Sequence, residues 1–213
     1  LRAELSAQLQ NPIAKQERWS TDAPDAHILN RFAVAAAENL AGSLRLLDHR
    51  VFDQVVGLLN DRKRRIHCGG GRITHAIAGY LAMHLQMARP HVSLIPSAAS
   101  HWPQYALDLG KGDVVVLFDI RRYDARMLEF AASAKERGAR IVLITDQWIS
   151  PIARLAVHSL PLRIEAPSTW DSNMVPLFVA ETLVAATVAA SWPATQARIR
   201  ELESLSTPGR RGK

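Results

Sequence analysis

Three consecutive glycines follow a short apolar segment and precede a hydroxyl residue. Residues 68–74 read CGGGRIT, and an apolar helical pattern begins there. Glycines let the backbone approach a ligand closely, and amides at a helix N-terminus attract anions. This pattern indicates an anion site with four contributing residues: Gly70, Gly71, Arg72 and Thr74. The alternative is a tight strand-to-helix turn without a ligand. A P-loop is excluded because no Gly-Lys-Ser/Thr sequence follows.

Two adjacent arginines follow the most apolar segment of the chain. Residues 114–118 read VVVLF, and residues 119–124 read DIRRYD. Guanidinium groups bind carboxylates and phosphates through paired N–H donors, so Arg121 and Arg122 beside Tyr123 predict an acidic ligand. The alternative is that both arginines pair with aspartates of the same segment or with a partner subunit.

Two further segments add polar side chains after apolar runs. Ser97 and Ser100 follow residues 92–95, and Asp146 follows residues 140–145. Hydroxyls and a carboxylate can hydrogen-bond a ligand, although Ser100 and Asp146 are equally suited to capping the helical turns after them. A dinucleotide site would require an acidic residue at the end of the second strand, where the sequence reads IPS, so that site is excluded. The predicted ligand-binding residues are Gly70, Gly71, Arg72, Thr74, Ser97, Ser100, Asp119, Arg121, Arg122, Tyr123 and Asp146.

Strand and helix patterns alternate along the chain. Apolar runs predict strands at residues 64–68, 92–95, 114–118, 140–145 and 160–164. Helical periodicity predicts helices at residues 28–47, 51–60, 72–87, 123–137, 171–191 and 194–205. Unbroken apolar strands belong to parallel sheets covered on both faces, so the fold class is a doubly wound α/β sheet. Ligands of such sheets bind at the carboxyl ends of the strands, where the polar segments described above lie.

No pattern in the sequence identifies a catalytic residue or a metal site. His75, His101 and Glu165 lack the spacing of a triad, a metal site or a carboxylate pair. Cys68 has no flanking histidine that would activate its thiol, and His67 is interpreted as a core residue. We therefore predict no enzymatic activity, no metal and no cofactor.

Composition is typical of a globular protein. The 213 residues are 48% hydrophobic and carry a formal charge of +6. The basic run at residues 62–65 can indicate nucleic acid, but we interpret it as a solvated lead-in to a strand. No run of about 18 apolar residues exists, so no membrane contact is predicted. The single cysteine fits a reducing compartment, so a cytoplasmic location is predicted.

Several motifs resemble the SIS (sugar isomerase) domain, specifically that of RpiR/MurR-type transcriptional regulators. They are GGGRIT at residues 69–74, KGDVVV at 111–116, AKERGA at 134–139, TDQWISPIA at 145–153 and PSTWDS at 167–172. The resemblance implies a three-layer α/β/α sandwich with a five-stranded parallel sheet of flavodoxin-like type. It also implies binding of a phosphosugar or related metabolite, and dimerisation through helices.

The resemblance also implies a domain organisation. Residues 1–26 resemble a linker helix and linker, residues 27–208 the effector-binding domain, and residues 209–213 a disordered tail. A helix-turn-helix domain would lie upstream of Leu1 and supply the only contact with DNA. The apolar helix predicted at residues 174–188 and the helix at residues 28–47 are expected to form a homodimer or a higher homo-oligomer.

The family's phosphate-binding loop departs from its usual pattern in this chain. Two serines of that loop are absent, and Asp119, Arg121 and Arg122 stand in it. The expected ligand is a small anionic metabolite, either a sugar phosphate or another organic acid. Two alternatives remain: a sugar-phosphate aldose–ketose isomerase with His75 or Glu165 as its base, and a structural dimerisation module with a vestigial pocket.

Overall fold

The computed structural model describes residues 27–206, in which helices and strands alternate. The helices are α3 (Ile28–Leu46), α4 (His49–Asn60), α5 (His75–Ala88), α6 (Trp102–Asp108), α7 (Ala125–Glu136), α8 (Met174–Ala190) and α9 (Trp192–Ser206). The strands are β1 (Ile66–Gly70), β2 (Val92–Leu94), β3 (Val114–Asp119), β4 (Arg140–Asp146) and β5 (His158–Leu162). Short 3₁₀ turns occupy Ala99–His101 and Pro151–Arg154. The predicted linker helix and the tail lie outside the described residues.

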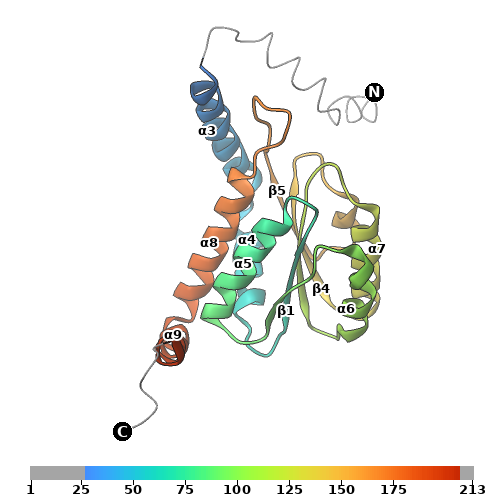
Figure 1. The fold of residues 1–213 in the computed structure, drawn as a ribbon, viewed down its shortest axis with the longest axis vertical. Helices are drawn as coiled ribbons and strands as arrows, with labels where there is room; N and C mark the ends of the chain where they lie inside the picture. Colours follow the sequence, from blue (N-terminus) through green and yellow to red (C-terminus); the bar gives the residue numbers. More distant parts are fainter. Residues whose placement is uncertain (1–26, 207–213) are drawn as a thin grey trace.

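The five strands form one parallel sheet in the order β2-β1-β3-β4-β5. Helices α3, α4, α5 and α8 cover one face, and α6 and α7 cover the other (Figure 1). The predicted α/β/α sandwich with a five-stranded parallel sheet is therefore confirmed. The chain passes from β1 outward to β2 and then back to β3, so the order reverses between β1 and β3, where such sheets bind ligands.

The core has two parts because side chains alternate between the faces of each strand. Val114, Val116 and Phe118 of β3 pack with α4, α5 and α8. Val115 and Leu117 of the same strand pack with α6 and α7. All residues of β3 are buried, as expected for a strand covered on both faces.

Element boundaries differ from the sequence predictions mainly around the glycines. Gly69 and Gly70 belong to β1, so the turn starts at Gly71 and α5 begins three residues later than predicted, at His75. Strand β1 starts at Ile66 because its register with β3 pairs Ile66 with Val114. Residues 102–108 form a helix with its proline in the first turn, where only a helical turn was predicted.

Helix α8 is apolar around most of its circumference, as predicted. Val175, Val179 and Leu183 face the core, whereas Met174 is 54% exposed. Among residues 27–206, no single helix is long and apolar enough to cross a membrane, and only α8 and α9 together, bent by 103°, reach the required length and composition.

Candidate functional site

A pocket of about 680 Å³ lies at the carboxyl edge of the sheet, beside the ends of β1 and β3. Three segments form its wall: residues 71–74, residues 119–126, and residues 169–171 with Asn173. The strand ends place these segments together, as the strand-order argument predicts. The wall contains several residues of the predicted ligand-binding set: Gly71, Arg72, Thr74, Asp119, Arg121, Arg122 and Tyr123.

The turn before α5 is built by close packing against the backbone. A Cβ atom on Gly70 would lie 2.7 Å from the carbonyl group of Thr74, so only glycine fits there. The Thr74 hydroxyl donates a hydrogen bond to the Phe118 carbonyl at 2.8 Å and ties the turn to β3. Gly70 and Thr74 therefore shape the turn, and Gly70 is not part of the wall of the 680 Å³ pocket.

Arg121 is held by a carboxylate within the chain. Its Nε and Nη2 donate to the Asp171 carboxylate at 3.0 and 2.7 Å, and its Cζ lies 4.0 Å from the ring centroid of Trp148. Arg121 is only 8% exposed, and its Nη1 has no hydrogen-bond partner among the described residues. The pairing anticipated for this arginine exists, but with Asp171 and not with the aspartates of its own segment.

Asp146 organises the loop that carries Arg121. This fully buried carboxylate accepts hydrogen bonds from the Arg121 amide at 2.5 Å, the Tyr123 hydroxyl at 2.7 Å and the Trp148 amide at 2.9 Å. Burial, with the hydrogen bond to Asp146, raises the pKa of Tyr123 above its ordinary value. Asp146 is not part of the pocket wall, but it accepts hydrogen bonds from two residues that are, Arg121 and Tyr123, and so supports the wall.

Asp119 is a buried carboxylate in the pocket wall, 3% exposed. Burial raises the pKa of Asp119 to about 6, although the Ser150 hydroxyl and the Asp124 amide donate hydrogen bonds to it. The nearby charges of Asp146 and Asp124 add to this rise. No ion pair of Asp119 with a cation occurs among the described residues, so its charge is stabilised by neutral donors alone.

Arg72 and Arg122 are the exposed cations of the wall that carry no internal carboxylate partner among the described residues. The Arg122 guanidinium carbon lies 5.4 Å from the ring centroid of Trp170, within the range of a cation–π contact. Arg126, by contrast, pairs with Asp124 at 2.9 Å. The pocket therefore contains two kinds of arginine: those neutralised by the chain and those open to a ligand.

Ser97 and Ser100 are exposed on the segment after β2 and are not part of the pocket wall. The predicted ligand-binding residues did not include the segment between β5 and α8, which contributes Thr169, Trp170, Asp171 and Asn173. Part of this segment had been noted only as a motif, at residues 167–172, that resembles the SIS domain. The available signal was topological, because this segment also follows the carboxyl end of a strand. The predicted helix began at residue 171, whereas α8 begins at Met174, so Asp171 lies in the segment before the helix.

The two bases considered for an isomerase do not lie in the pocket wall. His75 is partly buried in the first turn of α5, and Glu165 precedes the wall segment by four residues. Among residues 27–206, no group of three or more histidine, cysteine or acidic side chains is placed to hold a metal ion. Of the ionisable groups in the wall, Asp119 alone has a raised pKa near neutrality.

Solved structures with the same fold include regulators and enzymes. The sugar isomerase domain of an RpiR transcription factor from Sphaerobacter thermophilus has a TM-score of 0.78 at 21% identity, covering 84% of this chain and 99% of that one. Vibrio vulnificus NanR, solved with ManNAc-6P, has a TM-score of 0.71 at 17% identity, covering 86% and 70%. A phosphoheptose isomerase from Francisella tularensis has a TM-score of 0.62 at 11% identity, covering 75% and 95%. At these identities the similarity establishes the fold.

Family membership comes from the sequence itself. No curated protein matches the chain. The family model described as the SIS domain matches residues 58–186, which span β1 to β5 and most of α8. This match covers more than half of the 213 residues and includes most of the pocket wall. The chain therefore belongs to the SIS domain family.

Proposed function

We propose that this SIS domain is the effector-binding and dimerisation domain of a bacterial transcriptional regulator. Its effector is a small anionic metabolite, a sugar phosphate or another organic acid. The observation that carries the proposal is the open pocket of about 680 Å³ whose wall includes Arg72 and Arg122 without internal carboxylate partners. A volume in this range suits a small molecule.

The fold similarity supports this choice. Two of the similar structures are an RpiR transcription factor and NanR, and NanR was solved with a sugar phosphate. Thr74 and Arg121 are buried in the wall of the pocket of about 680 Å³ and do not fill it, which disfavours the vestigial-pocket alternative. In this proposal a separate domain contacts DNA in the cytoplasm, and the effector alters its affinity for the operator.

A thermal-unfolding screen tests the proposal. Ligand at a hundred times its Kd adds about 2.7 kcal/mol, which raises Tm by roughly 5 to 10 °C for a domain of this size. The panel contains sugar phosphates, sugar acids and their uncharged parent sugars. We expect at least one anion to raise Tm while its parent sugar does not. A panel without any stabilising anion would contradict the proposal.

The same proposal includes a homodimer. Helix α3 exposes Ile28, Leu29 and Val34, which are 53%, 69% and 59% exposed, and α8 leaves Phe178 and Val184 only partly covered. Association would remove this apolar surface from water. Light scattering at micromolar concentration should give twice the chain mass, and Val34→Glu should reduce it. A monomeric mass for the unsubstituted chain would contradict this part.

An isomerase is the second candidate function, because the pKa of one carboxylate in the pocket, that of Asp119, suits a general base. The pKa of Asp119 is about 6, close to the working pH that favours acid–base catalysis. A phosphoheptose isomerase shares the fold. Turnover of a phosphosugar that is abolished by Asp119→Asn would favour this candidate. Turnover that persists in the variant would exclude Asp119 as the base.

A further inference from the structure

Five segments lead into the five strands at the edge of the sheet opposite the pocket. Each runs from the last two residues of a helix or 3₁₀ turn to the first residue of a strand. They are residues 59–66, 87–92, 107–114, 135–140 and 153–158. Because all five strands are parallel, these segments share one edge, and together they are called the amino-edge surface.

The amino-edge surface carries the positive charge of the described domain. Its segments contain ten of the 20 lysines and arginines among residues 27–206, but only four of the 16 aspartates and glutamates. The surface therefore has a formal charge of +6, whereas the rest of the described residues have a formal charge of −2. The basic run at residues 62–65, interpreted from the sequence as a solvated lead-in to a strand, is one part of this larger surface.

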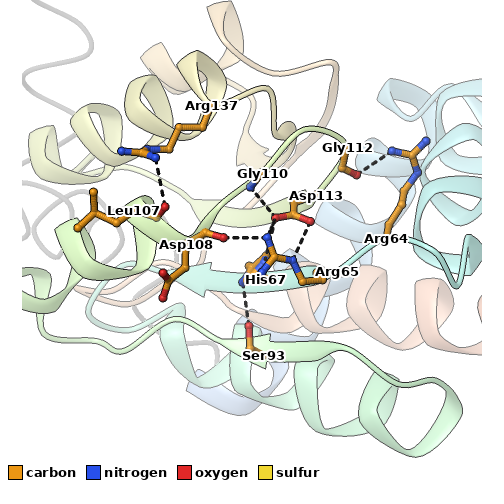
Figure 2. A network of polar contacts seen from close by, with 10 residues as sticks. All are labelled: Arg64, Arg65, His67, Ser93, Leu107, Asp108, Gly110, Gly112, Asp113 and Arg137. Atoms are coloured by element: carbon orange, nitrogen blue, oxygen red, sulfur yellow. Dashed lines mark hydrogen bonds and ion pairs between the residues drawn. The ribbon is translucent and has the colours of Figure 1, made fainter.

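The segments that lead into β1, β3 and β4 are in direct contact. Arg64 Nη1 donates a hydrogen bond to the Gly112 carbonyl at 2.7 Å, and Arg65 pairs with Asp113 at 2.6 Å (Figure 2). The Gly112 amide in turn donates to the Gly138 carbonyl at 3.1 Å. These three segments therefore form one continuous surface.

Part of its positive charge stabilises the fold. Helices end at this edge, and their last carbonyl groups attract cations. Arg65 Nη2 donates to the Asp108 carbonyl at 2.7 Å, and Arg137 Nη1 donates to the Leu107 carbonyl at 3.1 Å, both at the end of α6. Arginines of this kind do not by themselves indicate a partner.

Three other cations of the surface have no such role. Lys63, Lys111 and Arg140 are exposed, and their side chains make no hydrogen bond or ion pair among residues 27–206. Burial lowers the pKa of His158, and the charge of Arg140 lowers it further. The amino-edge surface thus holds more positive charge than its own carbonyls and carboxylates engage.

The register of the sheet fixes where these cations lie. Ile66, Val114 and Arg140 are aligned across the adjacent strands β1, β3 and β4, and Lys63 and Lys111 each lie three residues before their aligned residue. Neighbouring strands are about 4.8 Å apart. Duplex DNA carries one phosphate charge per about 1.7 Å of its axis, so a rigid row of cations can contact several phosphates at once.

The composition of the surface favours duplex DNA over other polyanions. None of its five segments contains phenylalanine, tyrosine or tryptophan, so the bases of a single strand would find no aromatic stacking partner. Its exposed large apolar side chains, which binding to a membrane surface would require, are limited to Met87, Leu107 and Val157, one in each of three segments. The phosphate backbone of a duplex requires only well-placed cations.

We propose that the amino-edge surface binds the phosphate backbone of double-stranded DNA through Lys63, Lys111 and Arg140. The contact is independent of base sequence. In the proposed regulator it adds a second contact with DNA to that of the separate domain. The inference does not involve the pocket, so it stands or fails independently of the effector.

Fluorescence anisotropy of a labelled mixed-sequence duplex, titrated with the 213-residue chain, tests the proposal. The Kd should be micromolar at about 50 mM salt, and the logarithm of the binding constant should fall linearly with that of the salt concentration, with a slope of about −3 for three phosphate contacts. A duplex that stays unbound at about 100 µM chain would overturn the proposal.

A pair of double variants with the same change in charge locates the contact. Lys111→Gln with Arg140→Gln should weaken binding by about tenfold or more at low salt and reduce the slope by about two. Arg45→Gln with Arg50→Gln is the control, because both arginines are exposed and lie around the start of α4, the end away from β1. Equal weakening by the two double variants would mean only an effect of net charge and would overturn the assignment.

Lysine acetylation of the unsubstituted chain provides a measurement that needs no variant. The three lysines among residues 27–206 are Lys63, Lys111 and Lys135, and all three belong to the amino-edge surface. Bound duplex should protect Lys63 and Lys111 from acetylation, as read by mass spectrometry. Protection confined to Lys213 would assign binding to the basic end of the chain and overturn the proposal.

Two other polyanions test the choice of partner. Vesicles of phosphatidylserine and phosphatidylcholine stand for an anionic membrane, and polyglutamate stands for an acidic protein. Both should bind more weakly than the duplex at the same ionic strength. Either one binding as tightly as the duplex, with the same loss in Lys111→Gln with Arg140→Gln, would overturn the assignment to DNA.

Discussion

The two edges of the sheet carry similar charged residues in very different surroundings. At the amino edge, Asp113 accepts hydrogen bonds from Arg65 Nε and Nη2 at 3.1 and 2.6 Å and from the Gly110 amide at 2.8 Å (Figure 2). His67 Nδ1 is 2.9 Å from the Ser93 hydroxyl, and its Nε2 is 3.8 Å from Asp113. At the carboxyl edge, charged residues surround an open pocket.

The pKa values of two aspartates on β3 and its flank summarise the difference. Burial alone would raise the pKa of Asp113, but hydrogen bonds from Arg65 and Gly110 outweigh it and hold this pKa below 3.8. Burial dominates at Asp119 and raises its pKa to about 6. A carboxylate that is paired with a cation stabilises the fold. A buried carboxylate without a cation partner remains available to interact with a ligand.

The largest difference in stability between the two edges is expected when the central carboxylate of each is removed, Asp146 at the carboxyl edge and Asp113 at the amino edge. Asp146→Ala leaves three donors without this acceptor, one of them buried and two partly buried, so the free energy of unfolding should fall by about 3 to 5 kcal/mol. Asp113→Ala should cost only about 1 to 2 kcal/mol, because Arg65 is half exposed and water can replace the lost contact. Urea denaturation measures both, and an equal loss would contradict the comparison.

The pH dependence of Asp119 is the next largest effect. Its folded-state pKa of about 6 exceeds the ordinary 3.8, so the folded state is progressively destabilised as the pH rises between these values. Asp119→Asn removes this penalty and retains an acceptor for Ser150. Relative to the unsubstituted chain, its free energy of unfolding should therefore increase by about 2 to 3 kcal/mol between about pH 4 and pH 7.5. A difference independent of pH would show that folding leaves the pKa of Asp119 unchanged.

The amino edge should show a smaller effect at the acid end. The folded-state pKa of Asp113 lies below 3.8, so its contribution to stability is present at neutral pH and is lost as the pH falls through that folded-state pKa. Arg65→Gln should lower the free energy of unfolding by about 1 kcal/mol at neutral pH, because the 47% exposed side chain is well screened. The loss should vanish once the pH lies well below the folded-state pKa of Asp113. A loss that persists in acid would assign it to packing of the side chain.

The smallest effects are expected for the serines beyond the pocket. Ser97 and Ser100 are exposed and outside its wall, so alanine at either position should change the free energy of unfolding by less than about 0.5 kcal/mol. The rise in Tm caused by an effector should also stay the same. A reduced response in either variant would extend the ligand site to the segment after β2.

Most of the fold follows from local patterns in the sequence. The run VVVLF is β3 and is buried on both faces, and Gly138 adopts the positive φ of 83° expected after a helix. Boundaries were less predictable where glycines occur. Gly69 and Gly70 extend β1 because they pair with Leu117 and Phe118, a long-range contact that no local pattern contains.

The candidate site was only partly predictable for the same reason. Strand order placed the segments after β1 and β3 together, as anticipated. The partner of Arg121 was not anticipated, because Asp171 is 50 residues away and belongs to a segment that follows the last strand. Hydrogen-bond donation by Thr74 to Phe118 likewise depends on how the turn packs against β3.

Residue types and their order by themselves determined the sheet, its covering helices and the edge at which a ligand would bind. Apolar runs and helical periodicity are local properties that predict the strands and helices. The right-handed crossover between parallel strands then determines how these elements are arranged. Only the tertiary structure decided which arginines are neutralised and which carboxylates are buried without a cation. Those outcomes depend on distances between segments far apart in the chain. Neighbours that only folding brings together determine the pKa of a carboxylate and whether an arginine is already paired.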